Sequence, residues 1–173
     1  MKKLILLGTV TALLAPLSFA VEAVSAVHGT LSKIDSGAKT IVVKTADGTE
    51  HAFHFVVKTT VHGTEVGAKD AFHGLKEGSE VVAHYTATGS EYTAVEVDKI
   101  GKGGLKTMDG TVSEMKSGGK ELVMKSADGT EQAFHMADHA ATETGKGAEK
   151  SAKVTVYYTE DAGKKVVHFF EKR

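Results

Sequence analysis

The chain of 173 residues contains no cysteine and no tryptophan, and it has only one proline and one arginine. The lack of cysteine excludes disulfides, thiol nucleophiles and cysteine-based zinc or iron–sulfur sites. The single arginine is the last residue, Arg173, so bidentate arginine clamps on phosphate or carboxylate groups are nearly excluded. Lysine and arginine together number 21 and acidic residues 22, so no strong net charge points to a nucleic acid or to an acidic membrane surface.

Residues 1–20 have the three parts of a secretory signal peptide. Lys2 and Lys3 form a basic start, residues 4–14 form a short apolar core, and Ser18-Phe19-Ala20 is a small-x-small cleavage site. The apolar stretch is shorter than a bilayer span. We therefore expect a soluble mature protein in the periplasm or outside the cell, with the exact cleavage position left open.

Self-comparison of the chain reveals a duplicated unit. With a shift of 81 residues, residues 28–55 align with 109–136 without a gap, and 16 of these 28 positions are identical. Further along, residues 81–86 align with 154–159 at a shift of 73, so the second copy is eight residues shorter. The expected organisation is a first repeat at 27–100, a glycine- and lysine-rich flexible linker at 101–106, and a second repeat at 107–173.

Each repeat has the pattern of five short strands. In the first repeat the expected strands are 27–34, 39–45, 49–57, 80–87 and 92–100, and the second repeat has equivalents of all five. The Asp47-Gly48 and Asp128-Gly129 pairs are hairpin signals, because both residue types tolerate the positive φ of such turns. A short helix or loop is expected at 65–75, between the third and fourth strands.

These patterns predict an all-β protein of two tandem small five-stranded OB-like barrels. A unit of about 70 residues builds only a small core, and closing its sheet into a barrel removes the exposed edges. Three strands, a longer connection and two more strands is the order of an OB-like barrel. A pair of SH3-like barrels and one merged sandwich remain alternatives.

The turn and core positions resemble those of a known family. The first repeat has Gly29-Thr30-Leu31, Asp47-Gly48 and Phe53, and the second has Gly110-Thr111-Val112 and Phe134 among the matching motifs. They resemble the exported bacterial small β-barrel domains of unknown function, which often occur in tandem behind signal peptides. The resemblance implies a fold and a compartment, and no activity or site residues. A looser similarity to OB-like periplasmic copper chaperones transfers no site, because their metal site includes a tryptophan.

Histidine is unusually frequent, with nine residues. Neutral imidazole is the commonest protein ligand for zinc, copper and nickel, so histidine with carboxylate is the plausible metal chemistry of this chain. Only His54 and His135 occupy matching positions in the two repeats, and His139 follows His135 at the spacing of one helical turn. These three histidines are the candidate ligands for Zn or Cu. The competing interpretation places the histidines on solvated strand faces.

Other activities have less support in the sequence. No Gly-x-Ser-x-Gly, His-Glu-x-x-His or Walker-type motif occurs, and no carboxylate pair is placed by a motif, so no catalytic residue is assigned. Neither repeat is basic enough to suggest a nucleic-acid groove. Tyr157 and Phe169 are expected to face outward, where a cross-strand aromatic pair is favoured over stacking on a sugar or a partner.

The sequence leads to three hypotheses of function. The first is an exported, non-enzymatic binding or structural module with no cofactor and an unknown envelope or extracellular partner. The alternative is a periplasmic histidine-based protein that binds copper or zinc. An enzyme, such as a hydrolase, ranks third. The ligand, the oligomeric state and the physiological role are open at this stage.

Overall fold

The computed structural model of the chain describes residues 24–64, 72, 74–142 and 148–173. The first barrel consists of β1 (Ser25–Asp35), β2 (Thr40–Lys44), β3 (Glu50–His62), β4 (Glu80–Thr88) and β5 (Glu91–Lys99). The second consists of β6 (Lys106–Lys116), the 3₁₀ turn η1 (Ser117–Gly119), β7 (Glu121–Lys125), β8 (Glu131–Thr142), β9 (Lys153–Asp161) and β10 (Lys164–Lys172). Within these described residues, no helix has the length and apolarity to cross a lipid bilayer.

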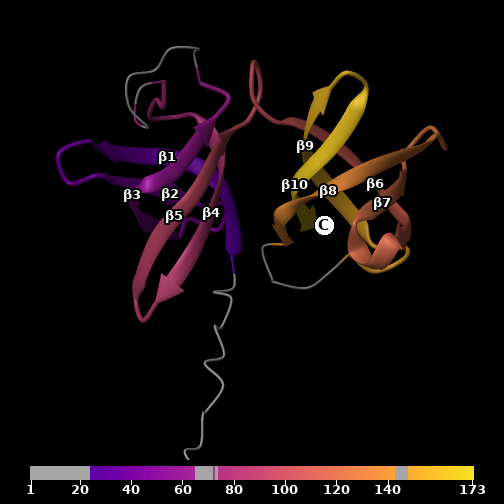
Figure 1. The fold of residues 1–173 in the computed structure, drawn as a ribbon, viewed down its shortest axis with the longest axis horizontal. Helices are drawn as coiled ribbons and strands as arrows, with labels where there is room; N and C mark the ends of the chain where they lie inside the picture. Colours follow the sequence, from indigo (N-terminus) through magenta and orange to yellow (C-terminus); the bar gives the residue numbers. More distant parts are fainter. Residues whose placement is uncertain (1–23, 65–71, 73, 143–147) are drawn as a thin grey trace, which may run out of the picture.

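Both repeats close into five-stranded barrels with the same topology (Figure 1). In the first barrel β1 pairs with β2 and β4, β2 pairs with β3, and β5 lies between β3 and β4. In the second, β6 pairs with β7 and β9, β7 pairs with β8, and β10 lies between β8 and β9. The contacts of β3 with β5 and of β8 with β10 are parallel, and the other pairings are antiparallel. The predicted all-β fold of two tandem small barrels is thus confirmed.

Each barrel encloses its own apolar core. Phe53 in the first and Phe134 in the second are fully buried, and each packs against a tyrosine of the fourth strand of its barrel. Alternation along the third strand of each barrel places these two phenylalanines inside. Burial of such side chains contributes about 2 kcal/mol each, which suits small domains without disulfides.

The connection between the barrels, at the flexible linker predicted for residues 101–106, contains a hydrogen-bonded turn. The backbone N–H of Gly104 donates to the oxygen of Gly101 at 2.9 Å, and the N–H of Leu105 donates to the oxygen of Lys99 at 2.8 Å. A Cβ at position 104 would collide with the Lys99 carbonyl, so the close approach requires glycine. The expected signal peptide and most of the expected helix or loop at 65–75 lie outside the described residues.

Candidate metal centre

The two barrels pack against each other through a small apolar cluster. It consists of Ala26, Val82, Leu105, Tyr157 and Phe169. Tyr157 on β9 and Phe169 on β10 are directly paired across the strands, with ring centroids 5.3 Å apart. They therefore form the cross-strand aromatic pair favoured from the sequence, and its outer face is covered by the first barrel.

Beside this cluster, two carboxylates lie on the outer face of the first barrel's sheet and are nevertheless buried. Glu96 and Asp98 of β5 are only 4% and 1% exposed. Residues two apart on a strand share a face, so both carboxylates point the same way. The strand register adds two histidines, because His84 of β4 is paired with Glu96 and His62 of β3 is paired with Asp98. Three adjacent strands thus place two acids and two histidines side by side.

The second barrel contributes His139 from β8 and His168 from β10 to the same place. The pairing of β10 with β9 shifts register between Val167 and Phe169, so His168 is the extra residue of a β-bulge. A bulge re-aims a side chain that regular alternation would place elsewhere. The Nε2 atom of His168 is hydrogen-bonded to the hydroxyl of Thr159 at 3.1 Å, which holds the ring with Nδ1 towards Glu96.

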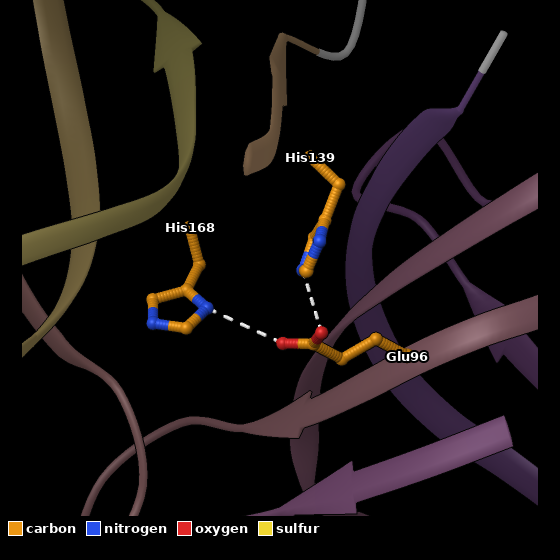
Figure 2. Close-up of side chains that lie close together, drawn as sticks. All are labelled: Glu96, His139 and His168. Carbon is orange, nitrogen blue, oxygen red and sulfur yellow. Dashed lines mark hydrogen bonds and ion pairs between the residues drawn. The ribbon is translucent and has the colours of Figure 1, made fainter. Parts of the chain in front are cut away.

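Glu96 is the point on which the two repeats converge (Figure 2). Its Oε2 lies 2.5 Å from Nε2 of His139, and its Oε1 lies 3.3 Å from Nδ1 of His168. One donor atom from each of these three residues lies within 4.8 Å of the other two. Such convergence of two imidazoles and a carboxylate from separate strands is the arrangement from which metal sites are built.

Asp98 extends this cluster on the side of the first barrel. Its Oδ1 lies 3.0 Å from Nδ1 of His62, which is also 3.2 Å from Oε1 of Glu96. Its Oδ2 lies 3.6 Å from Nε2 of His84 and 3.7 Å from Nδ1 of His168. His62, Glu96 and Asp98 form a second group of three donors within 4.8 Å of one another.

Within the part of the chain that the structure describes, several of these buried donor atoms have no hydrogen-bond partner. They are both ring nitrogens of His84 and Oδ2 of Asp98, whereas Nε2 of His139 faces Oε2 of Glu96. His84 is completely buried, so its two nitrogens are shielded from solvent as well. A buried polar group without a partner costs about 1–3 kcal/mol, and such groups call for an explanation. Metal binding in the cluster would provide a partner for Oδ2 of Asp98 and for one nitrogen of His84.

Burial and the mutual repulsion of the acids shift the pKa values at the centre. Burial lowers the pKa of His84 to about 4, so this histidine is neutral at physiological pH. Burial, with the charge of Glu96 as the next cause, raises the pKa of Asp98 well above the usual carboxyl range. Burial alone would raise the pKa of Glu96 too, but hydrogen bonds from His168 and Asp98 and two further histidines hold it low. Glu96 is therefore the ionised member of the acid pair.

A second polar contact joins the barrels nearby. The hydroxyl of Tyr157 donates to Oε2 of Glu171 at 3.0 Å and lies 3.1 Å from Nδ1 of His28. Burial, followed by the neighbouring Glu171 charge, raises the pKa of Tyr157. The tyrosine ring and hydroxyl are both engaged in the inter-barrel contact.

The candidate ligands named from the sequence occupy different places. His54 on β3 and His135 on β8 are exposed on separate barrels. The structure brings neither of them into the cluster. His139 is the one of the three that lies in the cluster, and it does so from a strand rather than from a helical turn.

Sequence reasoning missed five members of the cluster, which are His62, His84, Glu96, Asp98 and His168. A signal was present in the aligned repeats, where His84, Glu96 and Asp98 fall on Tyr157, Phe169 and Glu171. These substitutions concern only the outer face of the last two strands, since the inward positions are apolar or aromatic in both repeats. The outer face of these strands is polar in the first repeat and largely aromatic in the second. This difference between the copies indicates the surfaces through which the two barrels are in contact.

Comparison with known proteins gives similar folds only. No protein-family model matches the chain, and no curated protein matches it. Among solved structures, silver(I)-bound CusF is 9% identical, with a TM-score of 0.34 over 40% of this chain and 97% of that one. CusF from Escherichia coli, as a tryptophan-to-alanine variant with Cu(II), is 17% identical, with a TM-score of 0.36 over 47% of this chain and 98% of the other. At scores and identities this low nothing about a ligand transfers to this chain, whose candidate site rests on its own side chains.

Proposed function

We propose that this protein binds a divalent transition-metal ion, Zn²⁺ or Cu²⁺, between its two repeats. Glu96, His139 and His168 are the ligands, with solvent completing the coordination. The observation that carries the proposal is the convergence of these donors within 4.8 Å of one another from two barrels. This is the histidine-based metal binder that the sequence offered as the alternative to a module with solvated histidines.

The donor set selects the class of metal. Imidazole suits zinc, copper and nickel, whereas calcium and magnesium prefer sites made of oxygen atoms alone. Soft ions such as Cu(I) prefer sulfur ligands, and the chain has no cysteine. The methionines Met108, Met115, Met124 and Met136 belong to the second barrel's core cluster or pack against it. A borderline divalent ion therefore fits this set best.

The competing explanation is that the cluster serves only to dock the barrels. Buried ion pairs are weak contributors to stability, because removing two charges from water offsets much of their attraction. A docking network would also be expected to satisfy its own members, whereas His84 and Asp98 keep unpartnered buried atoms. This difference favours metal binding over docking alone.

The proposed role is capture or buffering of the metal without catalysis. The predicted signal peptide supports an activity in the periplasm or outside the cell. The side chain of His139 is 31% exposed, so the ion has an approach from solvent, while the side chain of Glu96 is 6% exposed. An ion held by one exposed and two shielded ligands is accessible for loading and is retained by the buried carboxylate.

Calorimetric titration of the exported protein with Zn²⁺ and Cu²⁺ tests the proposal. We expect a saturable, sub-micromolar site that weakens about 100-fold in His168→Ala, since a ligand is lost. The double variant His54→Ala/His135→Ala is the matched control, because it removes two exposed histidines outside the cluster. Millimolar, non-saturating heat, or equal affinity in His168→Ala, would refute the proposal.

A further inference from the structure

One metal ion leaves donors of the cluster unused. With an ion held by Glu96, His139 and His168, three further side chains remain, which are His62, His84 and Asp98. A tetrahedral zinc ion takes four ligands in all, and solvent is commonly one of them in an open site. The six side chains present four imidazoles and four carboxylate oxygens, a supply larger than one such ion requires.

We propose that the centre holds two divalent ions, bridged by the carboxylate of Glu96. The first is the inter-repeat ion, so this inference rests on the proposed function. The second lies among His62, Asp98 and Glu96, with His84 as a fourth ligand. All of the second ion's ligands belong to the first barrel.

The two oxygens of Glu96 are turned to different partners. Oε2 contacts His139 at 2.5 Å, and Oε1 contacts His62 at 3.2 Å and His168 at 3.3 Å. Oε1 thus lies between His168 of the second barrel and His62 of the first, so the carboxylate is positioned to bind the first ion through Oε2 and the second through Oε1. Two-metal sites in proteins hold their ions about 3.5–4 Å apart, a separation that a bridging carboxylate spans.

The second donor set has the geometry and burial of a built site. Nδ1 of His62 lies 3.0 Å from Oδ1 of Asp98, and Nε2 of His84 lies 3.6 Å from Oδ2 of the same carboxylate. Asp98 and His84 are 1% and 0% exposed, and Oδ2 and both ring nitrogens of His84 lack hydrogen-bond partners. Oδ2 of Asp98 and Nε2 of His84 face each other on the Asp98 side of the cluster, where an ion at the first position alone does not satisfy them.

Charge and access are compatible with two ions. Two dications bring four positive charges against the two carboxylates, and a hydroxide ligand would reduce the two charges left over. The side chain of His62 is 53% exposed, which leaves solvent access to the second position. The strand register fixes its ligands, because His62 and Asp98 are directly paired on β3 and β5.

Metal stoichiometry tests the inference. The exported protein is loaded with Zn²⁺, desalted and analysed for metal and protein. We expect two ions per chain in the wild type and one in His62→Ala, a half-exposed position whose replacement leaves the fold intact. His54→Ala, an exposed histidine on the same strand β3, is the matched control and should keep two ions.

The magnetic coupling of copper provides an independent readout. Two Cu²⁺ ions bridged by a carboxylate couple, so the paramagnetic resonance signal of the fully loaded protein should integrate to clearly less than two spins. In His62→Ala the signal should return to that of one isolated Cu²⁺ per chain. A wild type that binds a single ion tightly, or two uncoupled ions, would overturn this inference and leave the proposed function standing. A wild type that retains no metal would overturn both.

Discussion

His84 and Tyr157 occupy equivalent positions in the two barrels, and both are buried where the barrels meet. His84 is paired with Ala26 and Glu96, and Tyr157 is paired with Thr107 and Phe169. The same outer face of the barrel is thus polar in the first repeat and aromatic in the second. Packing the two faces together buries the polar set and creates the candidate centre.

The apolar half of this contact should support metal binding. Phe169 is fully buried in the inter-barrel cluster next to His168, so Phe169→Ala should weaken Zn²⁺ binding about tenfold or more by loosening the position of the ligand. It should also lower the free energy of unfolding by about 3–5 kcal/mol. Calorimetry and urea unfolding measure the two effects.

The neighbouring Phe170 provides the control for that variant. It lies on the opposite face of β10, in the core of the second barrel. Phe170→Ala should cost a similar amount of stability. Under conditions where it is folded, it should bind Zn²⁺ more tightly than Phe169→Ala; equal losses of affinity in both variants would count against a role for the inter-barrel contact.

The metal-free protein should lose stability in acid through His84. Burial lowers the folded-state pKa of His84 to about 4, below the unfolded value of about 6.5. The stability linked to neutral His84 is therefore fully present above pH 6.5 and is lost as the pH falls through 4. The difference of about 2.5 pKa units corresponds to about 3 kcal/mol at most.

A comparison with His84→Gln isolates this contribution, because glutamine does not titrate. Urea unfolding in the presence of a chelator should show the stability advantage of the wild type over His84→Gln shrinking between pH 7 and pH 4. Asp98 contributes with the opposite sign in the wild type, since its raised folded-state pKa favours the protein at low pH. A constant difference across this range would contradict a buried neutral histidine.

Bound metal should raise the unfolding temperature. An ion that binds only the folded state adds about 2.7 kcal/mol at a free concentration 100 times its dissociation constant. For a domain of this size that corresponds to an increase of about 5–10 °C. Differential scanning fluorimetry with Zn²⁺ should show the shift in the wild type, a loss of it with a chelator, and little shift in His168→Ala; an equal shift in that variant would point to ions bound elsewhere.

The fold was accessible from the sequence because its determinants are local. Alternation around Phe53 and Phe134, and the Asp-Gly turns after the second and seventh strands, lie in short segments that occur twice. The flexible linker at residues 101–106 stays a prediction, and the structure shows a turn there with hydrogen bonds to Lys99 and Gly101.

The candidate centre was less accessible because it belongs to neither repeat alone. Comparing the copies looks for a site that each repeat retains, whereas Glu96 and His168 come from different repeats and meet only after docking. The bulge at His168 adds a second obstacle, because alternation along β10 does not give its direction. Only His139 among the predicted ligands lies in the cluster.

The central claim is that a metal ion lies between the repeats, and anomalous diffraction tests it most directly. Crystals of the zinc-loaded protein, measured on both sides of the zinc absorption edge, should give an anomalous peak about 2.0–2.2 Å from Oε of Glu96, Nε2 of His139 and Nδ1 of His168. Absence of a peak there, with zinc found only at exposed histidines such as His54 and His135, would contradict the account.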